Sequence, residues 1–266
     1  MKSEFELKKD ICEVGRRIYT NGFVAANDGN ISVRIGENEV LTTPTGVSKG
    51  FMTPDMIVKA DLDGNVISGK LKPSSELKMH LDVYKHRDDV KSVVHAHPPT
   101  ATGFAVAGIS LNEMIMPEVI ITLGIVPIVK YGTPSTHEIP DAVREHLDCY
   151  DGFLLENHGA LTIGTDLFNA YFKMETIELA AKINLTARQL GGIKEISKEN
   201  VEKLYEVRKN LGVKGRHPAT CMECGVCSTD EIKSNSSDLG HNLDDDQLAS
   251  LVSEITKKVM AEVSKG

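Results

Sequence analysis

The sequence predicts a layered α+β domain, and three observations lead to this prediction. Short apolar segments with the character of strands are separated by turn signals such as Asp63-Gly64. Their connections are too short for the dozen-residue crossover that parallel neighbours need, so we expect a largely antiparallel sheet. Longer segments with helical periodicity interrupt these strands, without the regular alternation of βαβ units.

Each expected element follows from its local pattern. Apolar residues recur at helical spacing near the N-terminus, at Leu7, Ile11, Val14 and Ile18. They predict an amphipathic helix that ends at Gly22. Alternating or apolar runs between turns predict strands at 31–35, 39–43, 57–60, 65–68, 92–95, 124–129 and 152–156. Further helices are expected at 75–86, 138–147 and 167–190.

Composition divides the 266 residues into four parts. We expect the folded domain at 1–214 and a cysteine-rich segment at 215–227. Ser, Asp, Asn, Gly and Lys dominate residues 228–243, which we interpret as a flexible linker because this composition buries too little apolar surface to fold. At 244–266 a helical stripe of Leu, Ile and Val follows three aspartates, and it predicts an amphipathic C-terminal helix.

Charge and hydropathy exclude two kinds of partner. The chain has 30 Lys+Arg against 38 Asp+Glu and a net charge of -8, so its field repels nucleic acid and anionic lipid. The most apolar stretch, residues 115–129, contains Glu118 and two prolines, and it cannot form a spanning helix of about 20 apolar residues. The N-terminus lacks the apolar core of a secretory signal. We therefore expect a cytoplasmic protein with no nucleic-acid or membrane partner.

The cysteines favour thiol or metal chemistry over disulfides, because in a reducing compartment disulfides are rare. Three of the 5 cysteines repeat a Cys-x-x-Cys spacing close to His217, at Cys221, Cys224 and Cys227. Both a second metal site, for zinc or an iron–sulfur cluster, and reduced thiols on a flexible arm are compatible with this spacing. Cys12 and Cys149 stand alone, and each is expected to be a small buried apolar residue.

The strongest local signal is a pair of histidines on one strand, followed by two prolines. Side chains alternate along a strand, so His95 and His97 project from the same face about 7 Å apart along the backbone. This spacing allows both imidazoles to bind one ion. Taken alone, the pair is equally compatible with ordinary polar residues on a strand.

Two further motifs favour the metal site. An apolar strand leads into Glu156-Asn157-His158-Gly159, where a turn presents a third imidazole. Pro73-Ser74-Ser75-Glu76 opens a helix and places a carboxylate in its first turn, although a glutamate at a helix start is common in its own right. Three imidazoles with a displaceable carboxylate as fourth ligand suit a zinc ion that must later admit substrate.

Polar turns that contain glycine indicate an anion site. They are Asn27-Asp28-Gly29-Asn30, Thr43-Pro44-Thr45-Gly46 and the helix start at Ser74-Ser75. Each offers backbone N–H groups or hydroxyls of the kind that bind phosphate. Any one alone is an ordinary structural turn, and only their occurrence together favours a phosphate cradle.

Taken in order, five motifs between roughly residues 6 and 211 resemble the class II aldolase/adducin family. They are Asn-x-Gly-Asn-Ile-Ser, Thr-Pro-Thr-Gly, Pro-Ser-Ser-Glu, Val-His-Ala-His-Pro and Glu-Asn-His-Gly. The resemblance implies an α/β/α fold and a homotetramer with active sites at subunit interfaces. It also implies one zinc ion per subunit, held by His95, His97 and His158. Glu76 would complete the resting metal site and move protons during turnover.

The resemblance further implies retro-aldol cleavage of a ketose 1-phosphate, such as fuculose 1-phosphate, to dihydroxyacetone phosphate and a short aldehyde such as lactaldehyde. Zinc would act as a Lewis acid, so no Schiff-base lysine is needed. The substrate phosphate would lie near Asn27, Asn30, Thr45, Gly46, Ser74 and Ser75. The chain departs from the resemblance at one position. The resemblance implies a tyrosine from the neighbouring subunit as a proton donor toward the aldehyde part, whereas Met116 stands there in this sequence and Tyr131 lies nearby.

Two other functions found on the same scaffold fit these motifs less well. A pentulose-5-phosphate 4-epimerase uses the same bond cleavage without releasing the aldehyde, but it characteristically carries Asp where this chain has Glu76. Adducin-like domains are non-catalytic assembly modules that lack the zinc histidines, all of which are present here.

The C-terminal helix expected at 244–266 resembles the encapsulation peptides that recruit enzymes into bacterial microcompartments. Its apolar stripe would then bind a groove on a shell protein. A contact between subunits is the alternative role for this helix.

Overall fold

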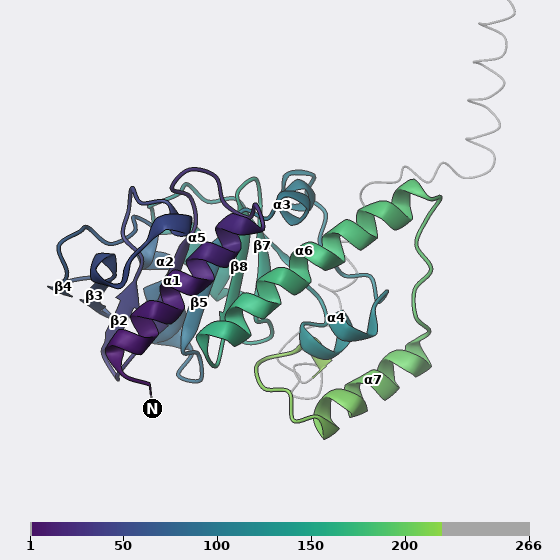
Figure 1. Ribbon diagram of the computed structural model, residues 1–266. Coiled ribbons are helices and arrows are strands. Elements are labelled where there is room, and N and C mark those ends of the chain that lie inside the picture. The colour runs from purple at the N-terminus through teal and green to yellow at the C-terminus, as the bar shows by residue number, and fades with distance from the viewer. Residues whose placement is uncertain (1, 220–266) are drawn as a thin grey trace, which may run out of the picture. The chain divides into compact units, whose positions relative to one another are not determined.

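The computed structural model describes residues 2–219. The three clustered cysteines, the expected linker and the expected C-terminal helix lie outside the described residues. Within them the elements are α1 (Glu4–Thr20), β1 (Asn30–Arg34), β2 (Glu39–Thr42), η1 (Lys49–Phe51), η2 (Pro54–Met56), β3 (Val58–Asp61), β4 (Val66–Ser68), α2 (Leu77–His86), β5 (Ser92–Ala96), α3 (Pro99–Val106), α4 (Pro117–Thr122), β6 (Ile128–Val129), α5 (Glu138–Arg144), β7 (Gly152–Leu155), β8 (Gly159–Gly164), α6 (Leu167–Gln189) and α7 (Lys198–Asn210) (Figure 1).

One mixed sheet forms the centre of the domain, in the order β4-β3-β2-β1-β5-β8-β7-β6. Every neighbouring pair is antiparallel except β6 and β7, so the expected, largely antiparallel sheet is confirmed. In the register of the central strands, Asn30 lies opposite His95 and Ala96 lies opposite Ala160. The ends of β1, β5 and β8 therefore meet at one place.

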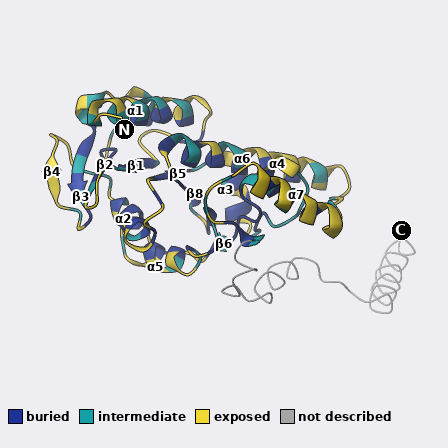
Figure 2. Ribbon diagram, turned by 90° about the horizontal axis from the view of Figure 1, so that it is seen from below, coloured by how far each residue is buried: buried dark blue, intermediate teal, exposed yellow. Residues whose placement is uncertain are grey.

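Helices cover both faces of the sheet, which gives the α/β/α layers that the resemblance implies. Figure 2 shows α1 and α6 on one side of the sheet and α2 and α5 on the other. Two buried apolar clusters fill these layers. One includes Ile11 of α1 and Met174 of α6, and the other includes Val83 of α2 and Phe153 of β7.

Sequence signals account for the start of helix α1. The Ser3 side chain accepts a hydrogen bond from the Glu6 backbone, and the Glu6 carboxylate accepts one from the Ser3 backbone. This reciprocal capping satisfies two N–H groups that a helix start otherwise leaves unpaired. The helix buries Ile11, Val14 and Ile18 on one face, as their spacing predicts.

Some elements differ from the prediction. The strand expected at 124–129 is reduced to the two residues of β6, because Pro127 has no N–H to donate to a ladder. Strand β8 was not expected, because all of its residues are buried and the sequence there shows no polar alternation. Helix α3 begins at Pro99, where only a strand end was expected, because proline is favourable at the first helical position. Helices α4 and α7 were also not predicted.

The two isolated cysteines differ in their surroundings. Cys149 is buried as expected, but it is disulfide-bonded, which contradicts the expectation that the cysteines remain thiols. Cys12 is a free thiol that is only partly buried on α1. None of the helices within residues 2–219 is both long enough and apolar enough to cross a bilayer.

Candidate active site

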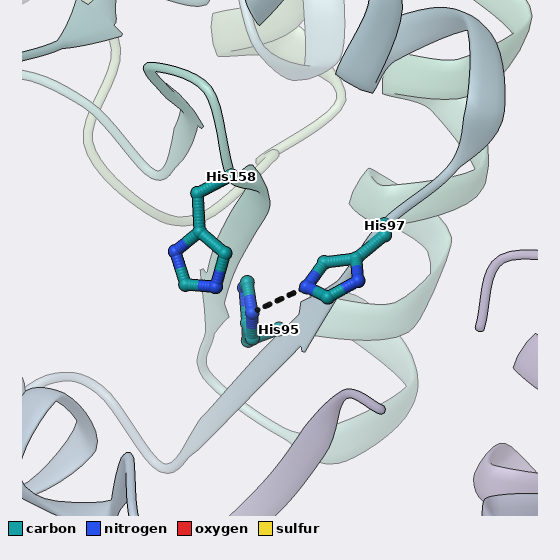
Figure 3. Close-up of side chains that lie close together, drawn as sticks. All are labelled: His95, His97 and His158. Atoms are coloured by element: carbon teal, nitrogen blue, oxygen red, sulfur yellow. Dashed lines mark hydrogen bonds between the residues drawn. The ribbon is translucent and has the colours of Figure 1, made fainter. Parts of the chain in front are cut away.

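Three histidines from distant parts of the sequence converge at the ends of the central strands. His95 lies on β5, His97 follows the same strand, and His158 lies in the turn between β7 and β8 (Figure 3). Their ring centroids are 4.6 to 5.3 Å apart, and one ring nitrogen from each lies within 4.8 Å of the others. Within residues 2–219 this is the one such group of three or more metal-binding side chains.

Strand pairing orients the innermost ring. Nδ1 of His95 donates a hydrogen bond to the carbonyl of Ala160 on the paired strand β8, at 2.9 Å. The proton is thereby held on Nδ1, and the lone pair of Nε2 points toward the other rings. Nε2 of His97 lies 3.2 Å from Nε2 of His95.

Gly159 permits the close approach of the turn that carries His158. A Cβ at this position would lie 2.6 Å from the carbonyl oxygen of Ala96 and 2.6 Å from Cδ2 of His97. Asn157, two residues earlier, adopts a φ of 54°, a left-handed conformation that asparagine tolerates better than most residues. The Asn-His-Gly sequence thus allows the third imidazole to reach the pair on β5.

Glu76 lies beside the three rings, although its place in the helix differs from the prediction. Helix α2 begins at Leu77 and not at residue 75, so Glu76 is the N-cap residue, and its side chain does not cap the helix. Its Oε1 lies 3.3 Å from Nε2 of His158, and its Oε2 lies 3.5 Å from Nε2 of His95. Nδ2 of Asn30 donates a hydrogen bond to Oε2 at 2.8 Å.

The four side chains fit a divalent cation. Ligands of a tetrahedral zinc ion lie roughly 3.3–3.4 Å from one another when each is 2.0–2.1 Å from the metal, and the neighbouring donor atoms described above are separated by 3.2 to 3.5 Å. Glu76 Oε1 is buried and has no hydrogen-bond partner among the described residues. A cation would compensate this unpaired carboxylate oxygen.

Electrostatics also favour metal binding at the histidines. Burial holds the pKa of His95 well below its ordinary range, and the neighbouring His158 and His97 lower it further. Burial and His158 also lower the pKa of His97, while Asp28 opposes the shift. Imidazoles that stay neutral keep the lone pairs that a metal needs.

A cavity of about 200 Å³ lies next to Glu76, His97 and His158. Of the residues expected near a substrate phosphate, those that line it are Asn27, Asn30, Thr45, Ser74 and Ser75. Gly46 does not line it, but its φ of 73° allows the turn that presents Thr45. Neither Met116 nor Tyr131 is among the described residues that line the cavity.

Sequence reasoning missed other parts of this cavity wall. Asp28, Lys49, Pro134 and Ser135 also line it. Asp28 belongs to the polar turn 27–30 that is expected at the anion site, and its carboxylate lies 3.7 Å from Nδ1 of His97. Ser135 has a φ of 69°, a strained value for serine that no local sequence signal predicts.

Backbone hydrogen bonds hold the polar loops of the cavity side by side. The Thr45 N–H donates to the carbonyl of Lys72 at 3.0 Å, and the Ser74 N–H donates to the carbonyl of Thr43 at 3.1 Å. The hydroxyl of Thr43 accepts a hydrogen bond from the backbone of Ile31 at the start of β1. All three loops expected in an anion site are therefore adjacent in the structure.

His217 does not behave as an open ligand near the cysteine-rich segment. Its buried ring donates from Nε2 to the carbonyl of Ile120 at 2.7 Å, and Nδ1 accepts from the backbone of Ala219 at 3.2 Å. A second metal site at the three clustered cysteines stays a prediction, because those residues lie outside the described part of the chain.

Residues 9–185 match the model of the Class II Aldolase and Adducin N-terminal domain. The chain belongs to the class II aldolase and adducin family. It is 36% identical over 181 residues to the L-fuculose phosphate aldolase of Methanococcus maripaludis, covering 68% of this chain and 97% of that protein. It is 32% identical over 183 residues to the 3-oxo-tetronate 4-phosphate decarboxylase of Haemophilus influenzae, covering 67% of this chain and 87% of that protein.

Solved structures of L-fuculose 1-phosphate aldolases share the fold. An L-fuculose 1-phosphate aldolase matches with a TM-score of 0.72 and 30% identity, over 79% of this chain and 98% of that chain. The L-fuculose-1-phosphate aldolase from Thermus thermophilus matches with a TM-score of 0.63 and 29% identity, over 73% and 100% of the two chains. Family membership and fold are therefore confirmed, and the chain is an enzyme of the class II aldolase superfamily.

Proposed function

We propose that this protein is a zinc-dependent aldolase that cleaves a ketose 1-phosphate resembling fuculose 1-phosphate into dihydroxyacetone phosphate and a short aldehyde such as lactaldehyde. The observation that carries the proposal is the convergence of His95, His97, His158 and Glu76 at the wall of a polar cavity. The fuculose phosphate aldolases among its relatives support the same substrate class.

In the proposed mechanism, the three histidines hold the metal and Glu76 moves protons. Zinc, when bound, supplies Lewis-acid stabilisation for the negative charge that develops next to the substrate carbonyl. As the carbon–carbon bond breaks, the hydroxyl of the departing fragment loses its proton and becomes the aldehyde. The carboxylate of Glu76 accepts this proton and returns one to the carbon of the phosphate-bearing fragment. Asn30 orients the carboxylate through the hydrogen bond that it donates to Oε2.

Metal analysis combined with a product assay tests this proposal. The purified full chain should contain about one divalent ion per subunit at the triad and release dihydroxyacetone phosphate from at least one member of a panel of ketose 1-phosphates. Treatment with a chelator should abolish the release, and added zinc should restore it. Release that persists after complete removal of metal would contradict the proposed mechanism.

Two related reactions are outcomes of the same assay. An epimerase would interconvert pentulose 5-phosphates and release no dihydroxyacetone phosphate. The similarity to a 3-oxo-tetronate 4-phosphate decarboxylase favours a second candidate, because loss of carbon dioxide next to a carbonyl leaves the same kind of negative charge for the site to stabilise. Carbon dioxide release from 3-oxo-tetronate 4-phosphate, without cleavage of ketose 1-phosphates, would favour that function. An adducin-like module would show neither reaction.

We further propose that the enzyme is a homotetramer with active sites at subunit interfaces. Helix α6 exposes large apolar side chains that a neighbouring subunit would cover, at Phe172, Leu179 and Ile183, and Leu190 follows at its end. Light scattering should give about four times the chain mass of 29.0 kDa. A monomer that retains full activity would contradict this assembly.

The C-terminal segment carries a separate proposal, based on its sequence alone. Residues 244–266 would bind a microcompartment shell protein, so that the cytoplasmic enzyme is enclosed together with its reactive aldehyde. Deletion of residues 242–266 should leave the tetramer and the activity intact and abolish co-purification with shells. Loss of the tetramer would instead indicate a contact between subunits.

The cysteine-rich segment is proposed as a second metal site, and it needs its own test. Replacement of Cys221, Cys224 and Cys227 by serine should lower the bound metal without changing the metal at the triad. An unchanged total metal content would favour free thiols.

A further inference from the structure

Lys49 lies in an environment that is unusual for a lysine. Its side chain is only 1% exposed, and it lines the cavity together with Thr45, Ser74 and Ser75. Lysine is almost never fully buried unless it is paired with an acid. Within residues 2–219 its ammonium group forms no ion pair with a carboxylate, and the Asp28 carboxylate, which lies beside His97, acts on it only at longer range. The positive charge is therefore without a direct counter-ion.

The ammonium group joins two of the loops that form the cavity. Nζ donates hydrogen bonds to the carbonyl of Asn27 at 2.9 Å and to the carbonyl of Val47 at 2.8 Å. An ammonium group has three N–H bonds, and the third has no acceptor among the described residues. The geometry leaves one donor available to a ligand.

Helix α1 packs closely against the backbone of Lys49. A Cβ on Gly15 of α1 would lie 2.6 Å from the carbonyl oxygen of Lys49, so only glycine allows the helix to pack this closely. The backbone of η1 is thus fixed against α1. Its lysine side chain reaches the loops from a rigid base, which limits how far Nζ can move away from the cavity.

A bound anion would compensate the free energy cost of burying this charge. Burial lowers the pKa of Lys49 to about 8, and Asp28 opposes the shift. The other groups of this cavity that could donate hydrogen bonds to a phosphate, the hydroxyls of Thr45, Ser74 and Ser75, carry no charge. A phosphate among them would supply the acceptor that the third N–H bond lacks and the counter-charge that the ammonium lacks.

We infer that Lys49 is the positively charged member of the substrate phosphate subsite, and that it also fixes the shape of that subsite by tying the 27–30 turn to the 43–49 loop. The inference rests on the proposed function, because it takes the substrate to be a sugar phosphate. It assigns to this lysine the preference for a phosphorylated over an unphosphorylated substrate.

Phosphate binding to metal-free protein tests this role without relying on catalysis. Titration calorimetry with inorganic phosphate, in the presence of a chelator, should show binding to the full-length wild-type chain. Lys49→Met, which keeps an unbranched side chain one atom shorter and removes the charge, should weaken binding roughly ten- to hundredfold. Lys49→Arg should retain part of the affinity. Lys85→Met, which removes a surface lysine paired with Asp63, is the matched control and should bind like wild type.

Kinetics separate a binding role from a purely structural one. Lys49→Met should raise KM for the phosphorylated ketose much more than for the corresponding unphosphorylated ketose. Equal losses on both substrates, with unchanged phosphate affinity, would overturn the assignment of Lys49 to the phosphate subsite and leave it only as a tie between the two loops. If wild type and variant differ in phosphate affinity but neither cleaves any ketose phosphate, the proposed aldolase function fails while the subsite assignment stands.

A readout on the wild-type protein covers the case in which Lys49→Met does not fold. The side-chain nitrogen of Lys49 can be followed by NMR in lysine-labelled protein, with Lys49→Arg used to assign the signal. Inorganic phosphate should shift this signal and raise the pH at which the ammonium loses its proton. A titration that phosphate leaves unchanged would overturn the inference.

Discussion

Asn30 donates a hydrogen bond to Glu76 at 2.8 Å, although 46 residues separate them in the sequence. Asn30 on β1 also lies directly opposite His95 on β5. The pairing of these two strands therefore positions both His95 and the hydrogen-bond partner of Glu76. The orientation of Glu76 therefore depends on strand β1 and not on its own helix.

This contact predicts the effect of replacing Asn30 by alanine. Without the amide donor, the Glu76 carboxylate loses its restraint, and kcat should fall about tenfold, the value of one hydrogen bond to a charged group. Metal content, measured by atomic absorption, should stay the same because Asn30 is not among the four donors. A variant that loses its metal would show that Asn30 acts through the metal site instead.

Glu76→Gln separates proton transfer from metal binding. The amide keeps the shape of the side chain and an oxygen that can still accept from Asn30, but it does not carry a proton between substrate atoms. We expect kcat to fall by ~10²–10⁴ with bound metal largely retained. Glu156→Gln, which changes a carboxylate that accepts from the backbone of Tyr131 outside the triad, is the control. Full activity in Glu76→Gln would refute the role assigned to this residue.

Gly159→Ala should damage the metal site through the backbone. The new Cβ would meet the Ala96 carbonyl and the His97 ring at 2.6 Å, so the turn that carries His158 must move away. We expect a loss of about 1–3 kcal/mol in stability and metal affinity lower by about 10–100-fold. Gly103→Ala on α3 is the matched control, because a Cβ there meets nothing within 4 Å. Normal zinc affinity in a competitive-chelator titration of Gly159→Ala would contradict this prediction.

The metal-free protein should lose stability in acid because of His80. Burial lowers the pKa of this residue to about 3, from 6.5 for the free side chain. Below pH 6.5 the unfolded chain therefore binds a proton that the folded chain does not, and the stability that His80 contributes above pH 6.5 is lost as pH falls toward about 3. Each pH unit in this window should cost up to about 1.4 kcal/mol.

Urea unfolding at several pH values, in the presence of a chelator, checks this dependence. The slope of unfolding free energy against pH should be smaller in His80→Gln than in wild type. His86→Gln, which replaces an exposed histidine on the same helix, should keep the wild-type slope. Identical slopes in wild type and His80→Gln would assign the acid sensitivity to other groups.

Local sequence patterns predicted much of the candidate metal site. The two-residue period of a strand predicts that His95 and His97 project together, and they do, although β5 ends at Ala96 and His97 follows it. The Asn-His-Gly turn and the Pro-Ser-Ser-Glu segment are also local signals. The antiparallel sheet followed from the shortness of the connections. Each of these predictions could be made from sequence because it depends on residues that are near one another in the chain.

Tertiary structure decided what depends on contacts between distant segments. The reach of His158 to the other rings requires the pairing of β5 with β8, and the orientation of Glu76 requires β1. Lys49 has the sequence context of an ordinary surface lysine, and its burial appears only when α1 packs on η1 through Gly15. The burial of a lysine cannot be read from the charges along the chain. The free energy of burying its ammonium group depends on neighbouring residues that come together only in the folded chain.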